Sequence, residues 1–194
     1  KNLSADGVEN VTTGLVAPLE LLSDIKSNRK ASIGKNIVVL GGGNVALDVA
    51  RTAKRLAGKE GSVKLVYRRT RSEMPADPEE LEEALEEGVE WIELANPAKV
   101  ITDNGRITSM KFRKMKIEGK DQSGRPKPVP DGDKEFTLNC DTVIPAFGQE
   151  VEPEFREFIN KQGASTEESE NILIGGDAKR GASGTLHVAS DIDG

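Results

Sequence analysis

The sequence predicts an α/β fold in which a parallel β-sheet carries helices on both faces and a small antiparallel β-meander is inserted. Three observations lead to this prediction. The apolar run IVVL at 37–40 is followed at once by three glycines, and a helical pattern of apolar residues follows the glycines. A second strand pattern comes at 63–67. A strand, a glycine turn, a helix and a parallel strand within about thirty residues form one βαβ unit, the building block of a Rossmann-type sheet.

The first elements along the chain are a helix, a strand and a second helix. A helix is predicted over 18–26, because Pro18 suits the first position of a helix. The run at 37–40 is apolar on both alternating sets of positions, as is typical of a strand covered on both faces, so we place it centrally in the sheet. Apolar residues then recur at helical spacing from Val45 to Leu56, and Gly58 can end that helix.

A third helix is predicted after Asp77, which can cap it. Pro78 occupies the first helical position, Glu80 has the spacing of a capping box, and Gly88 can stop the helix. Its many glutamates could form an acidic face that binds a partner, but such residues more commonly form a solvated helix surface. We therefore assign this helix no function.

The remaining segments are predicted to form the meander, a loop and a last strand. The segment 89–117 has a strand pattern, and the Asn-Gly pair within 103–106 favours a tight hairpin turn. The segment 119–135 is dense in glycine, proline and charge, so we expect an exposed loop. The stretch DTVIPAFG at 141–148 then returns to a buried strand that ends in a glycine.

Composition limits the functions that the chain can have. Its 194 residues are 36% hydrophobic and 31% charged, as in a globular domain of ordinary size. A net charge of -6 argues against general attraction to nucleic acid or to an anionic membrane. The single cysteine, Cys140, excludes an internal disulfide and any cluster bound by several thiolates of this chain. We therefore expect a cytoplasmic protein without a membrane span.

The glycines after the first strand form a candidate phosphate site. Gly41, Gly43 and Ala46 fit the motif G-x-G-x-x-A, in which the first residue permits a tight turn, the second lets the backbone approach a pyrophosphate, and the third lets helix pack on strand. The helix that begins near Asn44 directs free backbone N–H groups and the positive end of its dipole at the phosphates. Similar turns also serve packing alone, but the flanking strand and helix favour a dinucleotide here.

The end of the second strand indicates which dinucleotide binds. A fold of this kind that selects NAD ends this strand with an acidic residue about 20 positions after the glycines. Here Arg68 stands at the strand end, Arg69 and Arg71 follow, and no acidic residue lies between Arg68 and Glu73. A guanidinium can bond two phosphate oxygens at once, so the cluster favours the 2′-phosphate of NADP(H). The alternative is a solvated arginine turn that pairs with the glutamate-rich helix.

Four segments together carry a family resemblance. In chain order they are VVLGGGNVALDVARTAKRL, VYRRTRSEMPADPEELEEALEEGVEW, DTVIPAFGQ and ILIGGDAKRGASGTLHVASDIDG. They resemble the NADPH-binding region of the glutamate synthase small-subunit family and are similar to the amino-terminal half of dihydropyrimidine dehydrogenase. The resemblance implies an NADPH domain inserted into an FAD domain. Hydride would pass from NADPH to FAD, and electrons would pass through iron–sulfur clusters to a catalytic partner subunit or domain.

The resemblance also implies roles for individual residues. The residues implied to lie along the pyrophosphate are Gly42, Gly43, Asn44 and Val45. The three arginines are implied to surround the 2′-phosphate. Gly148 is implied to lie near the nicotinamide, and Gly176 and Asp177 to belong to the returning FAD domain, with Asp177 hydrogen-bonded to the ribityl chain of the flavin.

On the same resemblance we divide the chain into three parts. They are a lead-in segment from the FAD domain (1–33), the NADPH-binding domain (34–150), and a linker with a partial return into the FAD domain (151–194). The family's FAD-binding glycine motif and its cluster-ligating cysteines are absent from this sequence. We therefore expect the chain to correspond to part of a longer parent, to retain no FAD and to be inactive alone.

The other candidate residues offer little chemistry. His187 is the only histidine, so neither a metal cluster nor a Ser-His-Asp arrangement is expected. We expect Cys140 to be a small buried residue. No catalytic side chain is predicted, because the cofactor itself performs hydride transfer. Two alternatives stay open, namely an NADH-specific or FAD-binding use of the glycine loop, and a nonenzymatic interaction domain.

Overall fold

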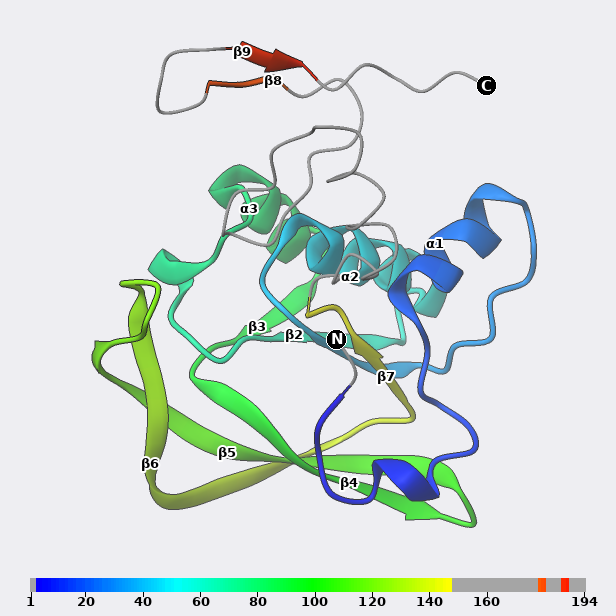
Figure 1. The fold of residues 1–194 in the computed structure, drawn as a ribbon. Coiled ribbons are helices and arrows are strands. Elements are labelled where there is room, and N and C mark those ends of the chain that lie inside the picture. The colour runs from blue at the N-terminus through cyan, green and yellow to red at the C-terminus, as the bar shows by residue number, and fades with distance from the viewer. Residues whose placement is uncertain (1–2, 148–177, 181–185, 189–194) are drawn as a thin grey trace, which may run out of the picture. The chain divides into compact units, whose positions relative to one another are not determined.

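The computed structural model describes three stretches of the chain, residues 3–147, 178–180 and 186–188. The chain divides into two compact units, residues 1–148 and 149–194. Two short antiparallel strands are described in the second unit, β8 (Ala178–Arg180) and β9 (Leu186–Val188). All other described elements belong to the first unit (Figure 1).

A four-stranded parallel sheet forms the centre of the first unit. From edge to edge its strands are β3 (Val89–Ile92), β2 (Ser62–Val66), β1 (Asn36–Leu40) and β7 (Thr142–Pro145). β1 pairs in parallel with β2 on one side and with β7 on the other. Residues 37–40 are at most 1% exposed, which confirms the central strand that their apolar pattern predicts.

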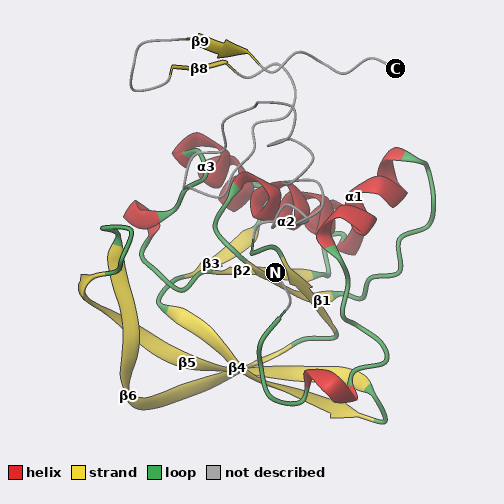
Figure 2. Cartoon of the chain, in the orientation of Figure 1, coloured by secondary structure: helices red, strands yellow, loops and turns green. Residues whose placement is uncertain are grey.

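Three helices lie over one face of this sheet (Figure 2): α1 (Pro18–Lys26), α2 (Asn44–Ala57) and α3 (Pro78–Glu86). α1 has the predicted bounds, with Pro18 at its first position. Leu21, Leu47 and Leu81, one from each helix, share a buried core with β-strand residues such as Val39. α2 ends before Gly58, whose φ of 72° is a conformation that glycine adopts without strain.

The predicted cap of α3 forms, but its capping box is incomplete. The side chain of Asp77 accepts a hydrogen bond from the N–H of Glu79 at 2.9 Å. In a capping box the side chain of Glu80 would bond the N–H of Asp77. That N–H instead donates to Oδ1 of Asn44, the first residue of α2, at 3.4 Å. Exposed Glu83 of α3 and half-buried Glu87 at its end pair with Arg51 of α2 at 2.8 and 2.5 Å, consistent with a solvated helix surface.

The other face of the parallel sheet packs on a three-stranded antiparallel meander. Its strands are β4 (Ala95–Asp103), β5 (Arg106–Lys120) and β6 (Pro126–Asn139). Val38, Leu40 and Val143 of the parallel sheet share a second buried core with Met110 and Phe112 of β5. The predicted α/β class with a parallel sheet and an inserted meander is confirmed. The prediction of helices on both faces differs from the structure, because the three described α-helices lie on one face and the meander covers the other.

The hairpin between β4 and β5 confirms the turn that the Asn-Gly pair predicts. Asn104 and Gly105 have φ of 48° and 78°. Positive φ at both central residues is typical of the two-residue turn whose twist matches that of the flanking strands.

The segment 89–117 differs from its prediction, because its first strand does not belong to the meander. β3 joins the parallel sheet, with Val89 opposite Val63 of β2. α3 crosses over between β2 and β3, and such a crossover returns the chain in the parallel direction. Leu94, with a φ of 54°, then separates β3 from β4.

The prediction of an exposed loop at 119–135 is wrong, because these residues belong to a long hairpin. β5 extends to Lys120, and β6 begins at Pro126. Pro126, Pro128 and Pro130 occupy alternate positions, so their missing N–H donors all lie on one side of β6. β6 is an edge strand of its sheet, where that side needs no partner.

The predicted lead-in segment forms backbone hydrogen bonds within the first unit. Asp6 donates its N–H to the carbonyl of Ala98 at 3.0 Å and accepts from the N–H of Val100 at 2.7 Å. Val16 donates to the carbonyl of Val143 at 3.0 Å. A short 3-10 helix, η1 (Val8–Asn10), lies between these contacts.

Candidate functional site

The glycine loop lies where the order of the parallel strands reverses. β2 and β3 follow on one side of β1, whereas β7 lies on the other side. In open α/β sheets, ligands bind beyond the carboxyl ends of the strands at this reversal. The loop of residues 41–43 joins the carboxyl end of β1 to α2, so the fold puts it at this position.

Gly41 and Gly42 leave no room for a side chain. Gly41 has a φ of 151°, and a Cβ atom there would lie 2.3 Å from the carbonyl oxygen of Ala146. A Cβ atom on Gly42 would lie 2.6 Å from the ring of Tyr67. The two residues therefore permit the tight turn that the motif predicts.

Gly43 is different, because a Cβ atom there would meet nothing within 4 Å among the described residues. The backbone N–H groups of residues 42–45 donate no hydrogen bond within the described part of the chain, whereas Ala46 donates to the carbonyl of Gly43 at 2.9 Å. Free N–H groups at the beginning of a helix attract anions. An open space beside free donors fits a pyrophosphate.

The three residues that follow the glycines have separate roles. Ala46 is fully buried, and its Cβ atom lies 3.1 Å from a Cβ built on Gly41, so α2 packs closely on the turn as predicted. Val45 is 39% exposed. Asn44 is exposed and uses its side chain to accept from the N–H of Asp77, which ties the loop to the start of α3.

Arg68 is the freest of the three predicted arginines. Its side chain is exposed, and it forms neither an ion pair nor a side-chain hydrogen bond with any described residue. Partial desolvation by the protein, and then the positive charge of Arg69, lower the pKa of its guanidinium. A cation in such surroundings gains from an anionic partner.

Arg69 is 4% exposed and is already bonded to the β5–β6 hairpin. Its Nε donates to the carbonyl of Pro126 at 2.8 Å, and its Nη2 pairs with Oδ2 of Asp121 at 2.7 Å. The side chain thus links the end of β2 to the hairpin.

Arg71 begins the 3-10 helix η2 (Arg71–Glu73) and pairs with Glu82 of α3. Its backbone N–H donates to Oε2 of Glu93 at 2.7 Å. The alternative prediction is a solvated arginine turn that pairs with the glutamate-rich helix. The pair between Arg71 and Glu82 is one contact of that kind.

Sequence reasoning missed a fourth arginine at this strand end. Arg125, from the turn between β5 and β6, donates through Nη2 to the carbonyl of Glu73 at 2.8 Å and to the hydroxyl of Tyr67 at 3.4 Å. The proline spacing of β6 is a signal for an edge strand, but it does not show that the hairpin returns toward β2.

The other predicted residues contribute no chemistry within the described stretches. Cys140 is buried, and burial raises the pKa of its thiol to about 12, so it is an unreactive core residue as expected. Gly148, Gly176 and Asp177 lie outside the described residues. No three metal-binding side chains gather in the described part, and none of its helices has the length and apolar content of a membrane span.

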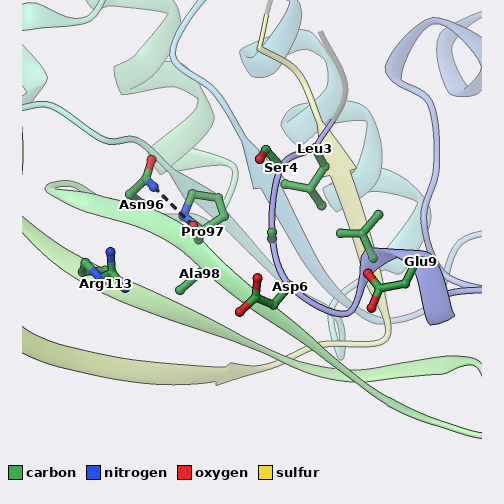
Figure 3. Close-up of a pocket in the computed structure, with 10 residues that line it drawn as sticks. Leu3, Ser4, Asp6, Glu9, Asn96, Pro97, Ala98 and Arg113 are labelled. Carbon is green, nitrogen blue, oxygen red and sulfur yellow. Dashed lines mark hydrogen bonds between the residues drawn. The ribbon is translucent and has the colours of Figure 1, made fainter.

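A separate open hollow of about 610 Å³ lies between the lead-in segment and the meander (Figure 3). Asp6, Glu9 and Arg113 are among its lining residues, with Asn96 on β4. No residue predicted for the dinucleotide lines it.

Comparisons with known proteins agree with the observed fold. A model of the pyridine nucleotide-disulphide oxidoreductase family matches residues 1–179. The NADP(+)-dependent formate dehydrogenase subunit beta of Moorella thermoacetica is 43% identical over 143 residues, which cover 73% of this chain and 20% of that protein. The glutamate synthase (NADPH) small chain of Escherichia coli is 30% identical over 178 residues, which cover 89% of this chain and 37% of that protein.

A solved structure, Mycobacterium tuberculosis FprA in complex with NADPH, is similar with a TM-score of 0.61 at 16% identity. The match covers 79% of this chain and 48% of that chain, and it bears on the fold alone. This chain spans well under half of the length of either curated relative.

Proposed function

Since this chain belongs to the pyridine nucleotide-disulphide oxidoreductase family, we propose that it is the NADPH-binding module of a flavoprotein oxidoreductase. The module presents NADPH for hydride transfer to FAD, from which electrons continue to a partner site. The observation that carries the proposal is the open space at Gly43, beside free N–H donors and at the same sheet edge as Arg68.

The proposal gives each part of the site one task. Gly43 and the N–H groups at the start of α2 bind the pyrophosphate, because the open space lets phosphate oxygens reach backbone donors. Arg68 binds the 2′-phosphate. Arg71 leaves its ion pair with Glu82 and also binds this phosphate. NADPH supplies the hydride when it is bound, and the chain's own residues bind and orient it.

The names of the relatives support NADPH as the cofactor. The formate dehydrogenase subunit is named for NADP(+), and the glutamate synthase chain for NADPH. Both are subunits or chains of larger enzymes by name, and this chain covers a minor part of each. We place the FAD-binding motif and iron–sulfur clusters in the rest of a cytoplasmic parent, with Gly148 near the nicotinamide and Gly176 and Asp177 in the returning FAD domain.

Calorimetric titration of the chain with NADPH and NADH tests the proposal. We expect NADPH to bind more tightly, and the preference to weaken as salt rises, because its source is charge. Charge-assisted hydrogen bonds contribute about 1.5–3 kcal/mol each, so Arg68→Ala should weaken NADPH binding roughly tenfold or more and leave NADH binding almost unchanged.

Arg106→Ala is the matched control, since it removes an exposed arginine at the β4–β5 turn. It should change neither affinity. Equal affinity of the wild type for the two cofactors would exclude the NADPH proposal, and tighter binding of NADH would favour the NADH-specific alternative. Absence of any dinucleotide binding would favour a nonenzymatic interaction domain.

A further inference from the structure

The tip of the β5–β6 hairpin is an ordered turn built around one carboxylate. Oδ1 of Asp121 accepts from the N–H and the hydroxyl of Ser123 at 2.9 and 2.6 Å, and from the N–H of Arg125 at 3.1 Å. Its other oxygen pairs with Arg69 at 2.7 Å. These contacts lower the pKa of Asp121 to about 2, and the hydrogen bond from the Ser123 hydroxyl contributes most. The carboxylate is therefore charged at neutral pH. The turn therefore has a fixed shape and a fixed attachment to β2.

This attachment brings the tip to the end of β2, next to the glycine loop. Tyr67 follows β2, its ring borders Gly42, and its hydroxyl lies 3.4 Å from Nη2 of Arg125. The same Nη2 donates to the carbonyl of Glu73 at 2.8 Å. Arg125 is thus held by neutral oxygen atoms only, and its positive charge is not neutralised by a carboxylate of the described residues.

The arginines at this strand end fall into two pairs by charge. Arg69 is neutralised by Asp121, and Arg71 by Glu82. Arg68 and Arg125 have no carboxylate partner among the described residues. The charge of Arg125 also acts on Arg68, where it adds to desolvation and to Arg69 in lowering the pKa of that guanidinium. Two neighbouring cations without counter-ions favour a ligand with two negative charges, such as a phosphate monoester.

We propose that Arg125 is a specificity-determining residue for NADPH, and that the hairpin tip at 121–125 forms the adenosine end of the site. In this arrangement, which rests on the proposed function, Arg68 and Arg125 bind the 2′-phosphate from two different elements. Arg69 does not contact the ligand; it is a positioning residue that fixes the tip through Asp121 and Pro126.

The test compares adenosine 2′,5′-bisphosphate with adenosine 5′-monophosphate, which lacks the 2′-phosphate. Arg125→Gln should weaken binding of the bisphosphate roughly tenfold or more and leave the monophosphate unchanged, because one charged contact is lost. Arg125→Lys, which keeps the charge, should retain most of the preference. Lys127→Ala removes an exposed charge two residues away and should alter neither affinity.

The outcomes separate this inference from the proposed function. If the wild type binds both nucleotides equally, both proposals fail. If the wild type prefers the bisphosphate and Arg68→Ala loses that preference while Arg125→Gln retains it, only the role of Arg125 is overturned. Thermal unfolding of each variant checks the fold, and monophosphate affinity reports separately that the glycine loop is intact.

Discussion

At the scale of single residues, the three glycines of one loop perform different tasks. Gly41 and Gly42 face backbone and ring atoms at distances that exclude a side chain, whereas Gly43 faces open space. The sequence motif assigns one small residue to the turn and one to the ligand. The structure distinguishes these two roles, because a Cβ atom would clash at the turn glycines and would meet open space at the ligand glycine. Substitution of the first two should destabilise the fold, and substitution of the third should alter the ligand site.

Gly43→Val should therefore abolish dinucleotide binding while the chain stays folded. The side chain would fill the space proposed for the pyrophosphate, and the φ of -98° at Gly43 suits any residue. Titration with NADPH and a thermal unfolding curve measure the two effects. Gly42→Ala is the contrast, since its Cβ would meet the Tyr67 ring and should lower the unfolding temperature. Wild-type NADPH affinity in Gly43→Val would show that the phosphates bind elsewhere.

At the scale of elements, local patterns predicted what local interactions determine. Pro18 and the cap residue Asp77 fixed the starts of α1 and α3, because helix ends depend on nearby residues. The direction of β3 and the pairing of β6 depend on strands that are not their neighbours in a local pattern, so the local sequence alone does not indicate which strands they pair with. For the same reason the glycine loop could be predicted and Arg125 could not.

The hairpin tip should make stability depend on pH through Asp121. Its folded-state pKa of about 2 lies below the value of about 3.9 expected in the unfolded chain, so its stabilisation is complete above that value and is lost as pH falls toward 2. Asp121→Asn should therefore unfold at lower urea concentration than the wild type at pH 7, and the difference should shrink on acidification.

Asp133→Asn controls for the loss of an exposed carboxylate from the same hairpin. It should show little difference from the wild type at any pH. A urea difference for Asp121→Asn that stays constant down to about pH 3 would mean that the charge of Asp121 does not stabilise the tip.

At the scale of the whole molecule, the matches bear out the resemblance to the glutamate synthase small-subunit family. The first compact unit contains more than the predicted NADPH domain, since the lead-in segment bonds to β4 and lies near β7. The predicted division at residues 33 and 150 stays a prediction. The long meander and the parallel sheet share one core, so the hairpin that positions Arg125 rests on the same scaffold as the glycine loop.

We predict that the purified chain retains no flavin and does not oxidise NADPH at a useful rate. The only G-x-G-x-x-A turn between a strand and a helix in the described residues is the one at β1, and the proposal assigns it to NADPH. Incubation with excess FAD, desalting and an absorbance spectrum measure the result. A yellow protein with about one flavin per chain, bleached by NADPH, would show that FAD binding needs nothing beyond this sequence.

The position of the single tryptophan has a practical consequence. The ring centroids of Trp91 and Tyr67 lie 6.0 Å apart, and Tyr67 lies beside both the glycine loop and Arg125. The indole of Trp91 is therefore an intrinsic fluorophore. Only the Tyr67 side chain separates it from the glycine loop and from Arg125. Its emission, with no dye attached and no second tryptophan to obscure it, gives an optical readout of ligand arrival and of any shift of the hairpin tip.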